Sequence, residues 1–514
     1  MTEPTRDTSR APLAHRILYR DPDLLVIDKP AGLAVDAPER EDDLARRVRA
    51  LHPGYVGIVH RAERDSSGIC VFSLRREANA WLSPQLDQRT APRTVFALID
   101  SQLRRTTASQ ALRNARVMAS HKSLSLVALT LERDKLAALA ESLSPALIAP
   151  LHLQKLTLTR PSGPPLTLTA PTPWSLSRQV SPPPQTPEAW AQCLREGLWR
   201  RDVLAQAPDT DAYRLAHGLA DAIADVSVDL YGDFAVVHVF EPLAPDTLSA
   251  LYQAVASAYR VRGVYVKHRR KQSNTLVDTR RDEVAPSAPV WGEAHPEPMT
   301  IVENGVRYVV RLGDGLSTGI FLDQRRNRAW LRANSAGKSL LNLFAYTGAF
   351  TVAAAAGGAS RSVSVDASRG SLAWLVDHLA ANGLADTPHL RVCAEVFGWL
   401  DGAHARGDQY DLVLCDPPSY SHAKDGPRFS SAQDWPELAA KCFAVCAPNA
   451  TLLATSNHRG ISPRKFRTMI LEGARLAKRE VVAIEGEDHC GAGDDFANTP
   501  DEAVALKAQR VRVR

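Results

Sequence analysis

The feature that most constrains this 514-residue chain is a regular alternation of short apolar runs with helical stretches from about residue 301 onward. The runs read, in chain order, SLLNLF, SVSVD, LRVCAE, YDLVLC and TLLAT. Short runs of this kind are typical of strands that lie buried in a parallel sheet. The alternation therefore predicts an α/β unit with a mostly parallel sheet and helices on both faces.

One stretch of this region, 340–359, has nearly the length and apolarity of a membrane-spanning helix. It contains Asn342, Tyr346 and Thr347, and Gly348 interrupts it in the middle. We therefore interpret it as a strand, a turn and a buried helix. The first ten residues, MTEPTRDTSR, lack the apolar segment of a secretory signal, so we expect a cytoplasmic protein with no membrane partner.

The composition narrows the class of protein further. Hydrophobic residues make up 45% and charged residues 23%, which excludes wholesale disorder, collagen and a long coiled coil. Lys and Arg total 62 against 57 acidic residues, a net charge of only +5, so any affinity for nucleic acid would depend on local clusters. The seven cysteines form no C-x-x-C pair, which favours a reducing compartment.

Breaks in composition predict several domains. Proline is dense over 161–187, which excludes a regular helix and favours an extended linker. Upstream, apolar runs such as 24–27 and 33–35 between turn signals predict a strand-rich unit. The expected divisions are a disordered tail at 1–12, a first α+β domain at 13–174, a proline-rich linker at 175–187, an α+β substrate-binding or RNA-binding domain at 188–300 and the α/β domain at 301–514.

Polar and small residues follow the apolar runs, where ligands bind in open parallel sheets. Gly348 lies in the turn after the first run and allows close approach of backbone to a ligand. Asp366 follows the second run, 22 residues beyond Phe344, which is about the spacing at which a carboxylate reaches a ribose hydroxyl in nucleotide-binding units. Glu395 follows the third run, and 416–420, which reads DPPSY, follows the fourth. In this order the residues predict a site for a nucleoside-bearing cofactor.

This array resembles the class I S-adenosylmethionine methyltransferases, which have a Rossmann-like fold. The segments that carry the resemblance are TGIFLDQRRNR, LNLFAYTGAF, SVDAS and LCDPPSYSHAK. They are similar to a group of 23S ribosomal RNA methyltransferases that modify carbon-5 of cytosine or nitrogen-7 of guanine, and the similarity covers about 190–514. The resemblance implies S-adenosyl-L-methionine as the cofactor, RNA as the partner and an α+β domain ahead of the catalytic domain.

The resemblance also implies roles for individual residues. Around the methionine part of the cofactor we expect Phe344, Tyr346 and Gly348. We expect Asp366 at the ribose and Glu395 at the adenine. A loop that closes over the cofactor is expected to contain Asp323, Gln324 and Arg325. Those expected to face the target base and to carry the catalysis are Asp416, Pro417, Pro418 and Tyr420, with Asp416 also beside the cofactor. Glu395 stands where the group usually has Asp.

The sequence also separates the two chemistries of this group. Methylation of carbon-5 needs a thiolate that adds to the ring, because an aromatic carbon has no lone pair to offer. In the carbon-5 branch the resemblance demands a cysteine near TLLAT, but here that segment continues as TSNHRG, which is similar to the guanine branch. Cys415 lies inside an apolar strand, where a buried structural thiol is expected. A nitrogen acceptor needs only positioning and in-line geometry.

The first unit resembles the pseudouridine synthases that carry the motif His-Arg-Leu-Asp-Arg-Asp-Thr-Ser-Gly. The matching text here is HRAERDSSG at 60–68, preceded by ILYRDPDLLVIDKPAGLAV and followed, more weakly, to about residue 174. The attacking aspartate of that family is replaced by Glu63, next but one to Arg61, and its tyrosine by Phe96. The extra methylene of Glu63 displaces the carboxylate by about 1 Å, which nucleophilic geometry tolerates poorly. We expect an inactive domain, with a surviving RNA-binding scaffold as its role.

A cluster of basic residues lies between positions 260 and 281. The members proposed to contact RNA phosphates are Arg260, Arg262, Lys267, Arg269, Arg270 and Lys271. A solvated hairpin is the alternative. Cys442 and Cys446 have helical spacing but no neighbouring Cys or His, so we expect core residues and no metal site.

The function expected from these observations is S-adenosylmethionine-dependent methylation of a nitrogen in a ribosomal RNA base. Two alternatives stay open. The first is a bifunctional methyltransferase and pseudouridine synthase with an active Glu63, and the second is a non-catalytic RNA-binding or ribosome-assembly protein.

Overall fold

The computed structural model describes most of the chain outside the N-terminal tail and several loops. The described residues are 16–31, 33–37, 43–87, 91–100, 115–121, 124–131, 139, 143, 147, 151–172, 176, 184, 186–221, 223, 225–269, 282–422, 428–485, 495–496 and 506–514. The expected tail at 1–12 and most of the expected linker at 175–187 lie outside these residues.

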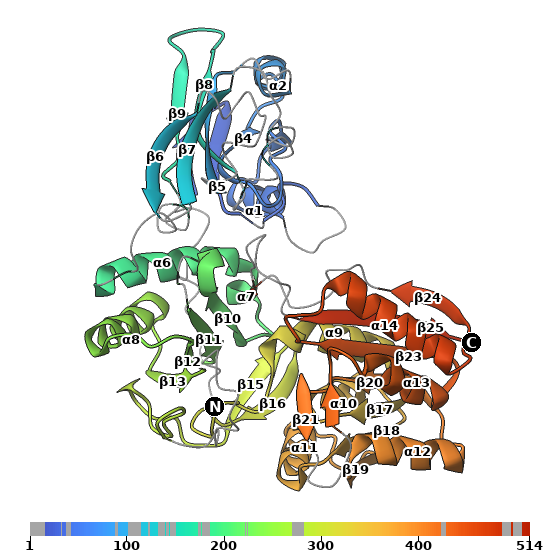
Figure 1. Cartoon of the computed structure of the whole chain (residues 1–514). Coiled ribbons are helices and arrows are strands. Elements are labelled where there is room, and N and C mark those ends of the chain that lie inside the picture. The colour runs from blue at the N-terminus through green and yellow to red at the C-terminus, as the bar shows by residue number, and fades with distance from the viewer. Residues whose placement is uncertain are drawn as a thin grey trace.

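The described residues of the N-terminal part include a nine-stranded sheet and the helices α1 and α2 (Figure 1). Its elements are β1 (Ile17–Arg20), β2 (Leu24–Lys29), α1 (Leu44–Leu51), β3 (Gly57–Ile58), β4 (Ser67–Ser73), α2 (Asn79–Asp87), β5 (Arg93–Asp100), β6 (Arg116–His121), β7 (Leu124–Leu131), β8 (His152–Leu158) and β9 (Leu166–Thr169). The strand order is β1-β2-β4-β8-β5-β7-β6, and β4 pairs with β8 in parallel. The strand-rich prediction is confirmed, except that 33–35 forms no strand.

The middle part is a five-stranded sheet in the order β10-β11-β12-β13-β14. Its elements are α6 (Pro187–Arg200), α7 (Asp202–Gln206), β10 (Ala212–His217), the 3-10 helix η3 (Gly218–Asp221), β11 (Val226–Tyr231), β12 (Phe234–Val239), α8 (Pro245–Tyr259), β13 (Gly263–His268) and β14 (Trp291–Gly292). Helices α6 and α8 pack together and against the sheet, so this part is α+β in character (Figure 1).

The C-terminal part alternates strands and helices, as the apolar runs predict. Its elements are β15 (Met299–Glu303), β16 (Val306–Val310), η4 (Leu322–Gln324), α9 (Arg325–Asn334), β17 (Ser339–Leu343), α10 (Ala349–Ala356), β18 (Arg361–Asp366), α11 (Arg369–Ala381), β19 (His389–Cys393), α12 (Val396–Arg406), β20 (Tyr410–Cys415), β21 (Tyr420–His422), β22 (Arg428–Ser430), α13 (Trp435–Ala444), β23 (Cys446–Ser456), α14 (Pro463–Leu476), β24 (Val481–Glu485) and β25 (Lys507–Val513). The strand order β19-β18-β17-β20-β23-β25-β24 is parallel through the first five strands and antiparallel at β25 and β24.

The pleat of this sheet explains why its strands are apolar on both faces. Leu341 and Val413 point into a core with α12, α13 and α14, whereas Leu340 and Leu412 point into a core with α9 and α10. The segment 340–359 is therefore a buried strand, a turn and a buried helix, as expected. Among the described helices, none has the length and apolarity needed to cross a membrane.

The structure corrects the expectation that the alternating pattern begins at 301. The first two strands there, β15 and β16, form a separate antiparallel hairpin instead of joining the parallel sheet. The hairpin shares a hydrophobic core with β11, β12 and α10, so it links the middle and C-terminal parts.

Candidate active site

A cavity of about 540 Å³ opens at the carboxyl ends of β17, β18 and β20. It is lined by Gly319, Ile320, Phe321, Asp323, Gln324, Arg328, Phe344, Ala345, Tyr346, Thr347, Ala349, Phe350, Asp366, Ala367, Glu395, Val396, Asp416, Pro417, Pro418, Ser419, Asn457 and Leu506. We call it the carboxylate cavity, because it holds four carboxylates, Asp323, Asp366, Glu395 and Asp416. Among the described lining residues the one guanidinium is that of Arg328, which is paired with the buried Glu303 at 2.6 Å and so does not offset these carboxylates. The cavity suits a ligand that carries positive charge beside apolar surface.

The turn between β17 and α10 brings backbone to the edge of this cavity. Phe344, Tyr346 and Gly348 have φ angles of 55°, 49° and 82°, a left-handed conformation that costs non-glycine residues free energy. At Gly348 a Cβ would lie 2.7 Å from Leu375, so only glycine fits. Gly348 itself does not line the cavity, and its effect is to shape the turn.

Two carboxylates stabilise the backbone around the cavity. Asp366 accepts hydrogen bonds from the backbone N–H groups of Tyr346 and Ser368, each at 2.8 Å. Glu395 is the N-cap of α12 and accepts from Phe397 N at 2.9 Å and Gly398 N at 2.8 Å. The longer arm of Glu395 thus reaches the first turn of its own helix while the residue still lines the cavity.

Asp416 is held by side chains from two other elements. Its Oδ2 accepts from Gln324 Nε2 at 3.0 Å, and its Oδ1 accepts from the Thr455 hydroxyl. Asn327 Nδ2 in turn donates to Gln324 Oε1 at 2.7 Å, which fixes the orientation of the Gln324 amide. Burial raises the pKa of Asp416 to about 6. A carboxyl group with a pKa close to neutral pH, held in place by fixed donors, is suited to accept a hydrogen bond from a ligand.

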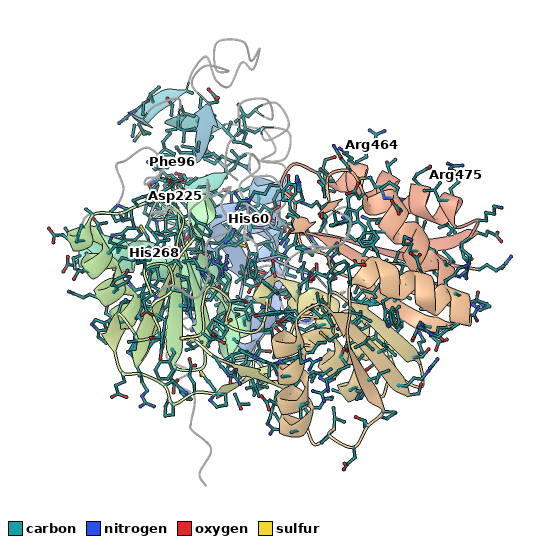
Figure 2. The ribbon with its side chains drawn as sticks, turned by 60° about the horizontal axis from the view of Figure 1, so that its bottom comes forward. His60, Phe96, Asp225, His268, Arg464 and Arg475 are labelled. Carbon is teal, nitrogen blue, oxygen red and sulfur yellow. The ribbon has the colours of Figure 1, made fainter. Side chains whose placement is uncertain are left out.

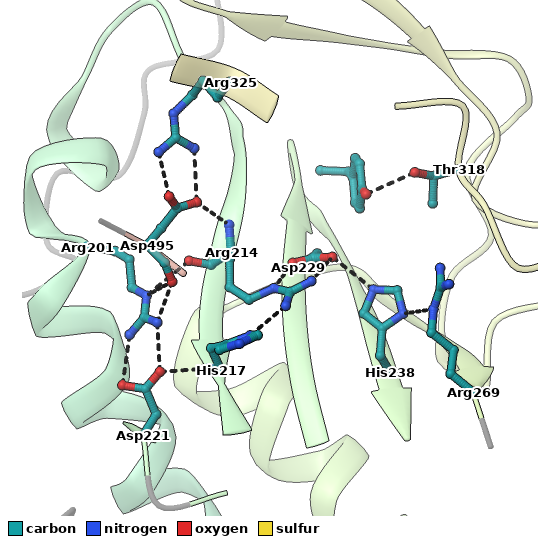
Figure 3. A network of polar contacts seen from close by, with 11 residues as sticks. Arg201, Arg214, His217, Asp221, Asp229, His238, Arg269, Thr318, Arg325 and Asp495 are labelled. Carbon is teal, nitrogen blue, oxygen red and sulfur yellow. Dashed lines mark hydrogen bonds and ion pairs between the residues drawn. The ribbon is translucent and has the colours of Figure 1, made fainter. Parts of the chain in front are cut away.

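The 316–325 loop forms one wall of the carboxylate cavity, and the middle sheet anchors it (Figure 3). At its start, Arg269 Nη2 donates to Leu316 O at 2.5 Å, and the Tyr231 and Thr318 hydroxyls lie 2.9 Å apart. Arg269 Nε donates to His238 Nδ1 at 3.0 Å, so the neutral His238 ring donates its other N–H to Asp229 at 2.8 Å. Burial lowers the pKa of His238 to about 4, in keeping with a neutral ring.

At the end of this loop the structure corrects the expected role of Arg325. Its guanidinium forms two hydrogen bonds with the Asp495 carboxylate, at 2.9 and 2.6 Å, and does not line the carboxylate cavity. Asp495 also accepts from the backbone N–H of Arg214 at 3.0 Å, and its carbonyl accepts from Arg201 (Figure 3). Burial raises the pKa of the neighbouring Asp323, which does line the cavity.

Tyr420 lies outside the carboxylate cavity, near its opening, and is 65% exposed. Its hydroxyl lies 3.2 Å from His458 Nε2, and the two rings meet edge to face with centroids 5.7 Å apart. Next to them Ser419 donates to Asn457 Oδ1 at 2.9 Å, and both of these residues line the cavity. The expected base-facing residues Pro417 and Pro418 line it as well.

Sequence reasoning missed several residues at this site. Thr455 lies near the end of the strand β23, and Asn457 directly follows that strand. Both belong to the segment TSNHRG, in which the sequence analysis sought only a cysteine. Phe321 lies in the segment TGIFLDQRRNR, but the sequence did not indicate a role for it. The centroid of its ring lies 5.5 Å from that of Tyr346. Leu506 and Asp495 come from distant sequence without any motif, and no local signal indicates them.

The structure removes part of the predicted basic cluster from the surface. Lys267 is completely buried, and burial lowers its pKa to about 8. Arg269 is occupied by His238 and Leu316, and Arg262 pairs with Glu293 at 2.5 Å. Arg260, at the end of α8, is exposed, whereas Arg270 and Lys271 lie outside the described residues. The strand β13 explains the burial of Lys267, because residues 263–267 of this inner strand are all buried and a cation there lies inside the protein.

In the N-terminal part, a buried lysine holds the backbone of the 60–68 segment through hydrogen bonds. The buried Lys29 ammonium donates to Arg64 O at 2.8 Å and Ser66 O at 2.6 Å. Glu63 is exposed, and its carboxylate forms no hydrogen bond or ion pair with a described residue, although its backbone carbonyl accepts from the Ser66 hydroxyl at 2.8 Å. Arg61 is paired with Asp36 at 3.3 Å. Phe96 is buried beside the His152 ring, with centroids 6.3 Å apart.

No group of three potential metal ligands occurs among the described residues. Cys442 and Cys446 are buried core residues, as predicted, and Cys446 donates to the Cys442 carbonyl.

The fold and the carboxylate cavity define a class of α/β protein that binds a nucleoside cofactor at the carboxyl ends of its strands. Residues 214–509 match the family of S-adenosylmethionine-dependent methyltransferases, and this match spans more than half of the chain. The chain belongs to this family, and its cofactor is S-adenosylmethionine. The acidic lining fits the sulfonium and ammonium groups of that molecule.

Named relatives and solved structures agree with this family. A Bacillus subtilis protein, YwbD, provisionally described as a ribosomal RNA large subunit methyltransferase, is 34% identical over 57% of this chain and 72% of its own. Ribosomal RNA large subunit methyltransferase I of Aeromonas hydrophila is 29% identical over 63% of this chain and 79% of its own. A solved structure provisionally described as a methyltransferase complexed with SAH is 28% identical, with a TM-score of 0.57, and the match covers 70% of this chain and 89% of that one.

Proposed function

We propose that this methyltransferase transfers a methyl group from S-adenosylmethionine to a nitrogen of a base in ribosomal RNA. The observation that carries the proposal is the Asp416 carboxylate, fixed by Gln324 and Thr455 at the carboxylate cavity with Asn457 and Tyr420 close by. Such an array can hold the edge of a base through its N–H groups. The names of the relatives support ribosomal RNA as the substrate.

The arrangement of the carboxylate cavity supports the following placement of the cofactor. Asp366 would hold the ribose, Glu395 would lie beside the adenine, and the turn of Phe344 and Tyr346 would surround the methionine part. Asp323 and Gln324 of the 316–325 loop would cover it. The cofactor supplies an electrophilic methyl group, and the residues of the chain position the acceptor in line with it.

The cysteines favour nitrogen over carbon-5 as the acceptor. Of the six cysteines that the structure describes, none lines the carboxylate cavity. Cys415 is completely buried in the sheet core, and burial raises the pKa of its thiol. Cys393 is exposed, and its Sγ donates to Ala367 O at 3.5 Å. Cys490 lies outside the described residues. A nitrogen lone pair can attack the methyl carbon without such a thiolate, while the C–S bond breaks and its electrons stay on sulfur.

For the N-terminal part we propose a pseudouridine-synthase-like domain without that activity. The exposed Glu63 carboxylate has no described partner to orient it, and the buried Phe96 provides no hydroxyl. We also propose the domain divisions 13–174, 188–300 and 301–514. The separate hydrophobic cores of the N-terminal and C-terminal sheets support the first of these divisions. At the last boundary the hairpin of β15 and β16 shares a core with both the middle sheet and α10.

The test of this function is methyl transfer from labelled cofactor to ribosomal RNA from cells that lack the gene. One base should be labelled on a nitrogen, and the Cys415→Ser variant should keep activity within a few-fold. A covalent adduct with RNA that contains 5-fluorocytidine would instead establish carbon-5 chemistry.

A further inference from the structure

The segment that leads from the carboxylate cavity into α14 carries several cations that have no acidic partner among the described residues. Residues 457–471 contain Arg459, Arg464, Lys465 and Arg467 and no acidic residue. Arg459, Arg464 and Lys465 are exposed, and Arg467 is partly exposed. None of the four forms a hydrogen bond or ion pair with a described acidic residue. We call these four residues the basic mouth surface.

This surface is continuous with the cavity wall. Asn457 lines the carboxylate cavity, and the next residue, His458, contacts the exposed Tyr420 ring. Arg459 follows directly, and Ser462 caps α14 by accepting from Lys465 N at 3.2 Å. The short chain distance keeps the basic mouth surface within about 25 Å of the cavity.

The position of these cations is unfavourable for the helix itself. Arg464 and Lys465 lie in the first turn of α14, where the helix dipole favours negative charge, and that turn contains no acidic residue. At the other end of α14, Arg475 interacts favourably with the helix dipole and forms an ion pair with Glu472 at 2.6 Å. Figure 2 shows Arg464 and Arg475 projecting outward from α14. Cations that oppose the stability of their own helix indicate a binding role.

We propose that the basic mouth surface binds the RNA phosphate backbone next to the target base, an assignment that rests on the proposed function. Phosphates match unpaired guanidinium and ammonium groups, and a base turned out of its strand can stack on exposed aromatic rings such as that of Tyr420. The surface thus takes the role that the sequence assigned to the 260–271 cluster, whose described members are mostly buried or paired.

The experiment compares double variants at the two ends of α14. Arg464→Gln/Lys465→Gln removes two of the proposed contacts in the first turn. Arg475→Gln/Lys478→Gln is the control, because Arg475 lies about 16 Å further along α14 and Lys478 follows the end of the helix at Leu476. The first should raise the KM for ribosomal RNA roughly tenfold and lower the slope of log affinity against log salt by about 1.4–1.8. Its cofactor affinity should not change, and its unfolding temperature should be equal to or above that of the wild type. The control should keep the wild-type KM and salt slope.

The outcomes separate this proposal from the proposed function. If the wild type methylates RNA and both double variants match it in KM and salt slope, the assignment of the basic mouth surface to RNA binding is wrong. The proposed function is then unaffected. An equal loss of RNA affinity in both double variants would indicate a diffuse charge effect and would also overturn the assignment. A wild type that binds the cofactor but methylates only a protein would overturn the function and the RNA assignment together.

Discussion

At the scale of single residues, the two carboxylates Asp366 and Asp416 differ in what surrounds them. Asp366 is fixed by backbone N–H groups, whereas Asp416 is fixed by side chains and has a raised pKa. The backbone N–H groups fix the position of the Asp366 carboxylate, whereas burial raises the pKa of Asp416 to about 6. The difference fits a cofactor-holding role for Asp366 and a role at the target base for Asp416.

We predict that Asp366→Ala weakens cofactor binding by about 1.5–3 kcal/mol, because charged hydrogen bonds are removed and the Tyr346 turn is no longer anchored. Isothermal calorimetry measures this change directly. Asp386→Ala, at an exposed carboxylate after α11, is the matched control and should bind normally. Unchanged affinity in Asp366→Ala would exclude the ribose role.

We predict that kcat/KM falls about tenfold per pH unit below pH about 6, because the ionised Asp416 accepts hydrogen bonds at both oxygens, whereas protonation removes its charge and turns one oxygen into a donor. The Thr455 hydrogen bond lowers this pKa, so Thr455→Val should move the midpoint to higher pH. The Asp416→Asn variant should have a low kcat/KM, and its kcat/KM should not fall further as the pH drops below about 6. A profile that keeps this fall in Asp416→Asn would assign it to another group.

At the scale of elements, the 316–325 loop depends on the middle sheet. Arg269 and Tyr231 hold its start, and Asp495 holds Arg325 at its end (Figure 3). The middle sheet therefore contributes to the wall of the carboxylate cavity, in addition to any contact with substrate.

We predict that Asp495→Ala lowers the free energy of unfolding by about 3–5 kcal/mol, because it leaves the buried Arg325 guanidinium without its carboxylate. Cofactor affinity should also fall, since Gln324 lies next to Arg325. Thermal unfolding and calorimetry on the same samples test both effects. The double variant Asp495→Leu/Arg325→Met should recover much of the stability, and failure to do so would show that the pair acts through other contacts.

At the scale of the whole molecule, the N-terminal sheet has hydrophobic cores of its own. Leu176 packs on Phe96 and so belongs with this part, whereas Thr186 stabilises the start of α6. A cut after residue 184 therefore separates the parts without exposing either core.

We predict that a chain lacking 1–184 binds the cofactor normally but binds ribosomal RNA more weakly. The slope of log affinity against log salt should flatten by about 0.7–0.9 for each RNA phosphate that the N-terminal part neutralises in the full-length chain. In that full-length chain, Glu63→Ala should change neither pseudouridine content nor methylation. Pseudouridine that forms with the wild type and disappears in Glu63→Ala would establish an active synthase.

The sequence by itself determined the five parallel strands β17, β18, β19, β20 and β23 and the positions where polar residues follow them. Both depend on local periodicity, which neighbouring residues define, and Asp366, Glu395 and Asp416 accordingly line one cavity. Only the tertiary structure decided that Arg325 pairs with Asp495, 170 residues away, that Lys267 is buried, and that β15 and β16 form a separate hairpin. These outcomes depend on which distant segments meet, because the direction and charge of a side chain are set by the partners that packing brings to it.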